Sequence, residues 1–205
     1  MASRATGPAD ALAAVVLAGG RSTRLGGQDK AALLLDGARL VDRVVAAAQA
    51  AGAREVVVVG PASLVPGVPV VQEEPPFGGP VAGVAAGLAA LGGGSTAVLV
   101  LACDLADPSA AVGALTAAWD GGAEEAGVHL LDEDGRPQWL TGIYRLDSLE
   151  SALTALGDPA GQSARRLLSA LPVRGVEGPA SAAADIDTWE DWEIVRRRHD
   201  SRRAR

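Results

Sequence analysis

The stretch AAVVLAGGRSTRLGGQDK, residues 13–30, joins an apolar segment directly to a loop of glycines and basic side chains. Residues 13–18 are short, apolar and rich in valine, which predicts a buried first strand. Residues 19–29 combine glycine with small polar residues, which predicts a loop at the carboxyl end of that strand.

Outward from this loop, strands and helices are expected to alternate through the first half of the chain. Apolar residues at helical spacing predict helices at 40–51 and 81–91, and apolar runs predict strands at 55–59, 69–72 and 97–102. This alternation predicts an α/β fold: a single three-layer Rossmann-like domain with a mostly parallel sheet and helices on both faces.

The second half of the chain has a less regular pattern. Its expected helices cover residues 109–119, 146–156, 163–171 and 189–198, and its expected strands cover 127–131, 139–144 and 173–176. We expect residues 1–12 to form a flexible N-terminus and residues 199–205 to form a basic tail that frays.

Composition restricts the function classes. The net charge of −7 argues against a nucleic-acid partner, because nucleic-acid-binding surfaces are usually basic. The single cysteine, Cys103, excludes an intrachain disulfide and suits a reducing compartment. With no apolar run of ~20 residues, we expect a soluble cytoplasmic protein without a membrane partner.

The basic residues are distributed unusually. Lys30 is the single lysine among 18 lysines and arginines, and the excess of alanine and arginine suggests a coding bias. A lysine retained against that bias indicates a chemical need for a compact ammonium group, which the planar guanidinium of arginine does not reproduce.

The loop that contains Lys30 has the features of an anion site. Gly19 and Gly20 let the backbone N–H groups approach a phosphate, and Arg21, Arg24 and Lys30 add three cations. The alternative is a solvated turn between two elements. Residues 73–83 and Asp104 also follow expected strand ends, so we expect all three segments to converge on one cleft.

The loop resembles LAGGxSxRxGGxDK, the signature of the molybdenum cofactor guanylyltransferases and their MobA-like relatives. The resemblance continues through EEPPFGGPVAG (73–83), LACD (101–104), PQWLTGIYR (137–145) and DIDTWED (185–191), and so covers nearly the whole chain. It implies a nucleotidyltransferase that moves an NMP from an NTP to a phosphorylated acceptor and releases pyrophosphate.

The resemblance also implies site residues. The catalytic set is Arg24, Lys30 and Asp104, of which Arg24 and Lys30 bind the triphosphate and Asp104 ligates Mg²⁺. The nucleotide would further contact the first loop and the 73–83 loop, which helps to read the base and ribose; these contacts are Leu17, Ala18, Gly19, Gly20, Arg21, Glu74, Gly79, Pro80 and Gly83. The resemblance places nucleotide binding in residues 13–108 and acceptor binding in residues 109–198.

Nucleotidyl transfer brings two anions together, so cations must do most of the catalytic work. Mg²⁺ prefers a few carboxylates together with phosphate oxygens and water. We expect Asp187 to be a second ligand, with Asp185 as its rival, although Asp187 or Thr188 could instead cap the following helix. The chain departs from the family's CDxP pattern, because its proline is displaced to Pro108, and it has Trp189 where relatives usually have proline.

The resulting hypothesis is a Mg²⁺-dependent transferase of GMP from GTP to molybdopterin. Two alternatives keep the enzyme class: a molybdopterin cytidylyltransferase and a sugar-phosphate nucleotidyltransferase. A third, from another class, is a non-catalytic nucleotide-binding partner in cofactor delivery. We expect a monomer or a weak homo-oligomer.

Overall fold

The computed structural model describes residues 11–19, 30–61, 65, 67–122, 124–179, 181–186 and 188–203. Seven strands form one sheet in the order β5-β4-β1-β6-β8-β7-β9. In chain order these are β1 (Leu12–Leu17), β4 (Glu55–Val59), β5 (Val70–Val71), β6 (Ala97–Ala102), β7 (Gly127–Leu131), β8 (Pro137–Arg145) and β9 (Val173–Glu177). A separate hairpin, β2 (Leu34–Leu35) and β3 (Ala38–Arg39), follows the short 3-10 turn η2 (Lys30–Ala32).

The sheet is mostly parallel, as the sequence predicts. β1 pairs in parallel with both β4 and β6, β4 with β5, and β7 with β9. β8 pairs antiparallel with β6 and β7, and is the one strand of the described sheet that runs against its neighbours. The carboxyl ends of six strands therefore meet at one edge, where the amino end of β8 also lies.

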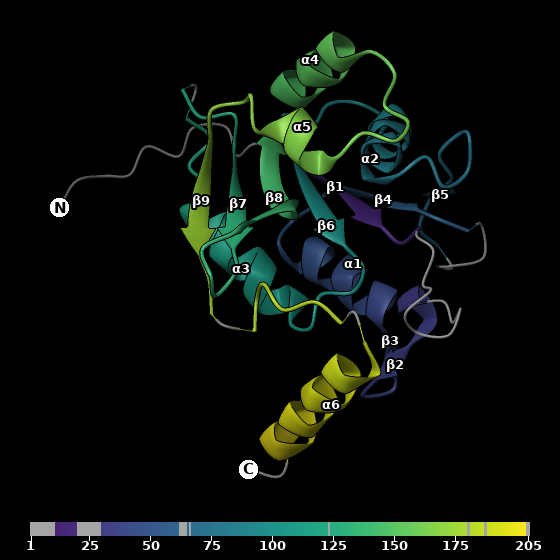
Figure 1. Cartoon of the computed structure of the whole chain (residues 1–205), viewed down its shortest axis with the longest axis vertical. Coiled ribbons are helices and arrows are strands. Elements are labelled where there is room, and N and C mark those ends of the chain that lie inside the picture. The colour runs from purple at the N-terminus through teal and green to yellow at the C-terminus, as the bar shows by residue number, and fades with distance from the viewer. Residues whose placement is uncertain are drawn as a thin grey trace, which may run out of the picture.

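Helices cover both faces, which confirms the three-layer fold (Figure 1). α1 (Leu40–Ala50) and α3 (Pro108–Ala118) pack on one face, while α2 (Pro80–Ala89), α4 (Leu146–Leu156) and α5 (Ala164–Leu168) pack on the other. Successive side chains of a strand point to opposite faces of the sheet and so contribute to both helix layers. In β1, Ala14 and Val16 belong to one core cluster and Ala13 and Val15 belong to the other.

Helix α2 lies close to the sheet because glycines form its inner face. A Cβ at Gly87 would lie 2.4 Å from Cγ1 of Val15, and one at Gly83 would lie 3.2 Å from Cδ2 of Leu17. A larger residue at either position would push the helix away from β1. The two glycines thus keep the first turn of α2 next to the carboxyl end of β1.

Some element bounds differ from the sequence expectation. α5 ends at Leu168 rather than at residue 171, because Pro172 disfavours a helical conformation at the residue before it. β8 begins at Pro137, two residues earlier than expected. The last helix, α6 (Trp189–Arg203), continues five residues beyond the expected end, which suits the high helix propensity of its arginines.

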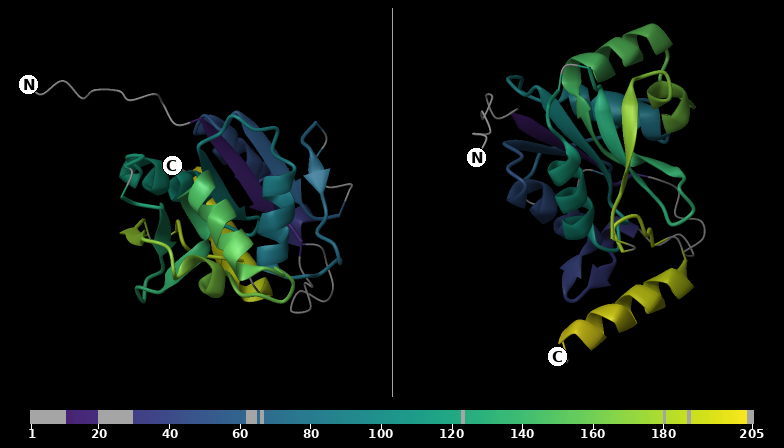
Figure 2. Two further views of the ribbon diagram at one scale, coloured as in Figure 1. Left: turned by 90° about the horizontal axis from the view of Figure 1, so that it is seen from above. Right: turned by 90° about the vertical axis from the view of Figure 1, so that its left-hand side faces the viewer.

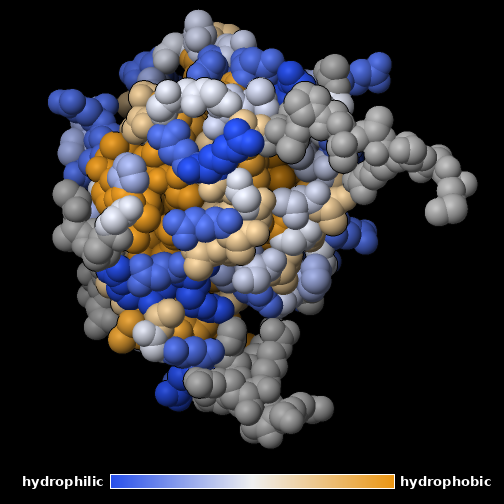
Figure 3. Space-filling view, turned by 180° about the vertical axis from the view of Figure 1, so that it is seen from behind, coloured by the Kyte–Doolittle hydropathy of each residue, from blue (hydrophilic) through white to orange (hydrophobic). Residues whose placement is uncertain are grey.

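Helix α6 projects from one end of the molecule, as Figure 1 and the right-hand view of Figure 2 show. It is attached through Trp192 and Val195, which pack with Leu35, Leu40 and neighbouring apolar residues of the hairpin and α1. Elsewhere on the surface, apolar patches lie between bands of hydrophilic side chains (Figure 3). Among the described residues, none of the helices has the length and apolar character needed to cross a bilayer.

Candidate functional site

A cavity of about 400 Å³ lies at the carboxyl ends of β1, β4 and β6. This is the edge at which parallel α/β sheets generally bind ligands. The wall combines strand ends, the turn at Lys30, the loop before α2, the first turn of α2 and one residue of β8. Its residues are Leu17, Ala18, Gly19, Lys30, Val59, Glu73, Phe77, Gly79, Pro80, Gly83, Ala102, Cys103, Asp104 and Leu140.

The carboxyl end of β1 forms the centre of this wall and is held by its neighbours. The N–H of Ala18 donates to the carbonyl of Val59 at 2.8 Å, and the N–H of Cys103 donates to the carbonyl of Leu17 at 3.0 Å. These bonds fix the backbone on both sides, so the start of the glycine-rich loop has a defined position at the cavity.

Lys30 and Asp104 form an ion pair in the cavity wall. Nζ of Lys30 lies 3.1 Å from Oδ2 of Asp104, and the two side chains are 18% and 20% exposed. Lys30 opens the η2 turn and Asp104 follows β6, so residues 74 positions apart in the sequence meet here. The pair places an ammonium and a carboxylate at one wall of the same cavity.

The segment before α6 runs beside Asp104. The N–H of Ile186 donates to the carbonyl of Asp104 at 3.0 Å, and Asp185 forms an antiparallel bridge with Leu105. This pairing brings Asp185, whose side chain is exposed, next to the Asp104 turn. Asp187 lies outside the described residues, so the identity of a second metal ligand stays a prediction.

The N-terminus of α6 is capped by Thr188. Its N–H and hydroxyl both donate to Oδ2 of Asp191 at 2.8 Å, and its Oγ1 accepts from the N–H of Asp191 at 3.2 Å. This reciprocal arrangement is a capping box. Of the two candidate caps named from the sequence, the structure therefore assigns this role to Thr188.

The structure brings most of the described candidates together. Those in the cavity wall are Leu17, Ala18, Gly19, Lys30, Gly79, Pro80, Gly83 and Asp104. Gly20, Arg21 and Arg24 lie outside the described residues. Glu74 is exposed and is not a wall residue, whereas its neighbour Glu73 is buried there, because its carboxylate accepts a hydrogen bond from the N–H of Phe77.

The first turn of α2 presents an electropositive helix end to the cavity. Gly79, Pro80 and Gly83 all line the wall, and none of the described side chains caps this end of the helix. Gly79 has a φ of 92°, which glycine adopts readily. Unpaired N–H groups and the helix dipole favour an anion at such an end.

Six wall residues were not among the sequence candidates: Val59, Glu73, Phe77, Ala102, Cys103 and Leu140. Phe77 lies in the loop before α2, within the quoted segment 73–83. Leu140 comes from β8, where the register with β7 shifts between His129 and Leu130, so that residues 139–141 bulge from the ladder. Nothing in the segment PQWLTGIYR itself indicates the bulge.

An aromatic pair lies beside that bulge. The rings of His129 and Trp139 are 4.5 Å apart between centroids, and His129 is buried. Burial lowers the pKa of His129, because desolvation penalises its charged form. Its Nδ1 has no hydrogen-bond partner within the described part of the chain, which is consistent with a neutral ring.

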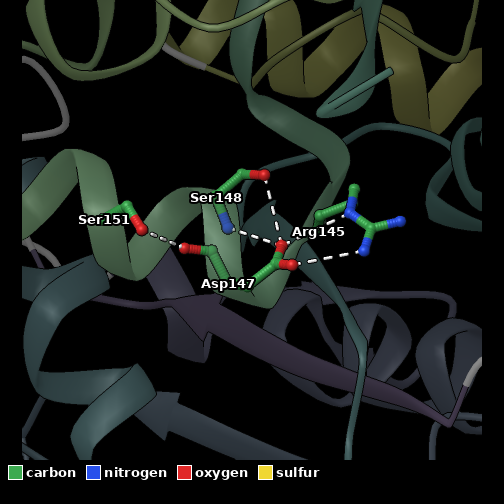
Figure 4. A network of polar contacts seen from close by, with 4 residues as sticks. All are labelled: Arg145, Asp147, Ser148 and Ser151. Atoms are coloured by element: carbon green, nitrogen blue, oxygen red, sulfur yellow. Dashed lines mark hydrogen bonds and ion pairs between the residues drawn. The ribbon is translucent and has the colours of Figure 1, made fainter. Parts of the chain in front are cut away.

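A second cavity, of about 680 Å³, lies between α4 and α5, at the opposite end of the sheet. Its polar side is formed by residues at the start of α4 (Figure 4). The guanidinium of Arg145 lies 3.2 Å from Oδ2 of Asp147, and the N–H of Ser148 donates to Oδ1 of Asp147 at 2.6 Å. The bond from Arg145 is the main cause of a lowered Asp147 pKa. These groups satisfy one another, so we interpret them as a structural helix start.

Comparison with known proteins adds independent information. The sequence profile of the MobA-like NTP transferase domain matches residues 14–175, that is, from β1 into β9. A curated relative, the probable molybdenum cofactor guanylyltransferase of Opitutus terrae, is 36% identical over 207 residues. That alignment covers 93% of this chain and 98% of the relative.

Solved structures share the fold. A nucleotidyl transferase from Methanothermobacter thermautotroptrophicus superposes with a TM-score of 0.66 at 24% identity, covering 91% of this chain and 96% of its own. The molybdopterin-guanine dinucleotide biosynthesis protein A of Archaeoglobus fulgidus gives 0.64 at 16% identity, covering 92% of this chain and 98% of its own. At these identities the likeness concerns the fold alone.

Proposed function

We infer, because the chain belongs to the MobA-like NTP transferase family and is a nucleotidyltransferase, that it transfers GMP from GTP to the phosphate of molybdopterin. The products would be pyrophosphate and the guanine dinucleotide form of the molybdenum cofactor. The Opitutus relative, a probable molybdenum cofactor guanylyltransferase, supports the guanylyl assignment. The observation that best supports this reaction is the Lys30–Asp104 ion pair in the cavity at the strand ends.

The proposed reaction is an in-line substitution at the α-phosphorus. An oxygen of the acceptor phosphate forms a bond to that phosphorus, and the bond to the oxygen that bridges the α- and β-phosphates breaks, with its electron pair leaving on pyrophosphate. No catalytic base is needed, because a phosphate monoester is already ionised near neutral pH. The remaining demand is to position the reactants and to stabilise the negative charge.

The cavity supplies this stabilisation from two directions. Lys30 contributes a cation at one wall, and the first turn of α2 contributes the positive end of a helix dipole. Preorganised charges of this kind stabilise the transition state without the reorganisation that water would require. Arg21 and Arg24, predicted from the sequence to bind the phosphates, would add to the same field.

Asp104 has two proposed roles. Its carboxylate holds the Lys30 ammonium at the wall, and it offers a hard oxygen ligand for Mg²⁺. Among the described residues, no three His, Cys, Asp or Glu side chains form a ready metal cage. This fits Mg²⁺, which usually takes one or two carboxylates and completes its shell with phosphate oxygens and water. When bound, the ion would neutralise charge on the triphosphate.

The test is pyrophosphate release measured with each of the four NTPs, with and without molybdopterin. We expect release with GTP that depends on molybdopterin and on Mg²⁺. Release with CTP in place of GTP would replace the guanylyl assignment with the cytidylyl alternative. If GTP binds but no acceptor from a panel that includes sugar phosphates supports release, the non-catalytic alternative would be favoured.

A further inference from the structure

Phe77 is an exposed aromatic residue in the wall of the cavity. It is the single phenylalanine of the chain, and 58% of its surface is exposed. Of the four exposed large hydrophobic residues in the described chain, Phe77 lies in this cavity wall and the other three, Leu34, Trp189 and Ile194, do not. An apolar ring that is exposed at a ligand cavity can bind a flat ligand by packing against it.

The backbone of Phe77 is held in a strained conformation. Its φ is 64°, in the left-handed region that bulky residues rarely adopt. Its N–H donates to Oε1 of Glu73 at 3.0 Å, and Glu73 is buried. Strain of this kind persists where surrounding contacts fix it, and it is often found at ligand sites.

The residue after Phe77 restricts the loop further. The N–H of Gly78 donates to the carbonyl of Pro75 at 3.1 Å, and the carbonyl of Gly78 accepts from Gly161 at 2.7 Å. A Cβ at Gly78 would lie 2.9 Å from Cβ of Ala82, so the loop lies tightly against α2. The fold therefore fixes the backbone that carries the Phe77 ring in advance of any ligand.

The wall that includes Phe77 has apolar residues suited to a base, beside the helix end that suits a phosphate. The charged pair Lys30–Asp104 marks one part of the cavity, and apolar wall residues are supplied by Val59, Pro80 and Leu140. Glu73, which holds the Phe77 amide, also faces the first loop, since its Oε2 would lie 3.9 Å from a Cβ at Gly19. A nucleotide whose phosphates lie near Lys30 would have the rest of this cavity, with Phe77 in its wall, available for its base.

We propose that the ring of Phe77 stacks on the base of the bound nucleotide and so contributes binding affinity that does not depend on which base is present. The inference rests on the proposed nucleotidyl transfer and assigns one further residue to its nucleotide site. Stacking of this kind tolerates every base, because each base has a π-face. Groups that contact the edge of the base would then distinguish one base from another.

The experiment is isothermal titration of the wild type and of Phe77→Ala with the four NTPs and with inorganic tripolyphosphate, all with Mg²⁺. Phe77→Ala should weaken the binding of each NTP that the wild type binds by about 5- to 160-fold, the range found for lost base stacking. Tripolyphosphate, which has no base, should bind both proteins alike. Phe77→Tyr should keep the wild-type affinities.

Two further variants serve as controls. Leu34→Ala removes a side chain with the same exposed fraction, 58%, from β2 outside the cavity, and should change no affinity. Phe77→Gly removes the ring and also the strain at a φ of 64°, so it should lose NTP affinity while its melting temperature is unchanged or higher. That combination excludes unfolding as the cause of the loss.

The outcomes separate the two proposals. Wild-type NTP affinity in Phe77→Ala, or an equal loss of tripolyphosphate binding, would overturn the stacking role while leaving the transferase function intact. Binding of CTP but not GTP, weakened by Phe77→Ala, would support stacking and overturn the guanylyl assignment. A wild type that binds no NTP would overturn both.

Discussion

Replacing Lys30 with alanine should separate catalysis from stability at this site. Lys30 lies in the cavity wall with its Nζ 3.1 Å from Asp104, and it is the cation that the proposed reaction uses from the described residues. We expect Lys30→Ala to lower kcat/KM by about 100- to 1000-fold, the effect of removing one preorganised charge-stabilising group from an active site. The fold should remain.

The small effect on stability follows from the geometry of the pair. At 3.1 Å the direct attraction is about 5 kcal/mol for an effective dielectric constant of about 20. Desolvation of both charges offsets most of this, so the net contribution of such a pair to folding is about 1 kcal/mol or less. For a domain of this size that corresponds to a shift of roughly 2–4 °C in melting temperature.

The assay is steady-state pyrophosphate release, with thermal unfolding followed on the same samples. Arg136→Ala is the matched control, because Arg136 pairs with Asp134 in an exposed ion pair that is not part of the cavity wall. This control should keep full activity. Lys30→Arg keeps the charge but not the compact ammonium, so we expect only partial recovery of kcat/KM.

A Lys30→Ala enzyme with kcat/KM within about three-fold of the wild type would refute the reasoning, since a lost charge interaction in the transition state is worth more than this. A loss of activity matched by loss of the folded state would refute it equally. Combining Lys30→Ala with Asp104→Ala should cost much less than the sum of the single effects, because residues that act as a unit are not additive.

Four further changes test the fold and its titration. Gly87→Ala, whose new Cβ would meet Val15 at 2.4 Å, should destabilise the protein by about 1–3 kcal/mol in urea unfolding. Gly113→Ala on α3, where nothing lies within 4 Å, should instead stabilise it by about 0.5–1 kcal/mol, and the opposite sign would contradict this packing. Burial lowers the pKa of His129 in the folded state. As the pH falls below about 6.5, this histidine is therefore protonated in the unfolded state before it is protonated in the folded state, and the free energy of unfolding declines. His129→Leu should flatten that decline between pH 7 and 5. Thr188→Ala should cost the α6 cap about 1 kcal/mol and speed amide hydrogen exchange in α6 while leaving β1 protected.

Most of the first half of the fold could be predicted because its signals are local. The strands at 55–59 and 97–102 have the bounds expected from their apolar runs. Short valine-rich runs that end in glycine or aspartate indicate buried parallel strands whatever their neighbours are. The carboxyl ends of such strands share one edge, so the convergence of Lys30 and Asp104 on one cavity also followed from the pattern.

The second half was predicted less completely because its geometry depends on pairing between distant segments. β8 is a strand by its own sequence, but its antiparallel direction and the bulge that presents Leu140 arise from its partners β6 and β7. The early end of α5 has a local cause, which is Pro172. The apolar periodicity of the segment nevertheless predicts a longer helix.

By itself, the sequence determined the α/β class and the position of a glycine-rich loop after β1, because these depend on composition and on local patterns. The roles of that loop and of Lys30 in anion binding stay predictions. Only the tertiary structure decided that Glu73 rather than Glu74 lies in the wall and that Phe77 lies there too. The physical reason is that a side chain's direction in a loop is set by long-range contacts, such as the bond between Gly161 and Gly78, which leave no periodic trace in the chain.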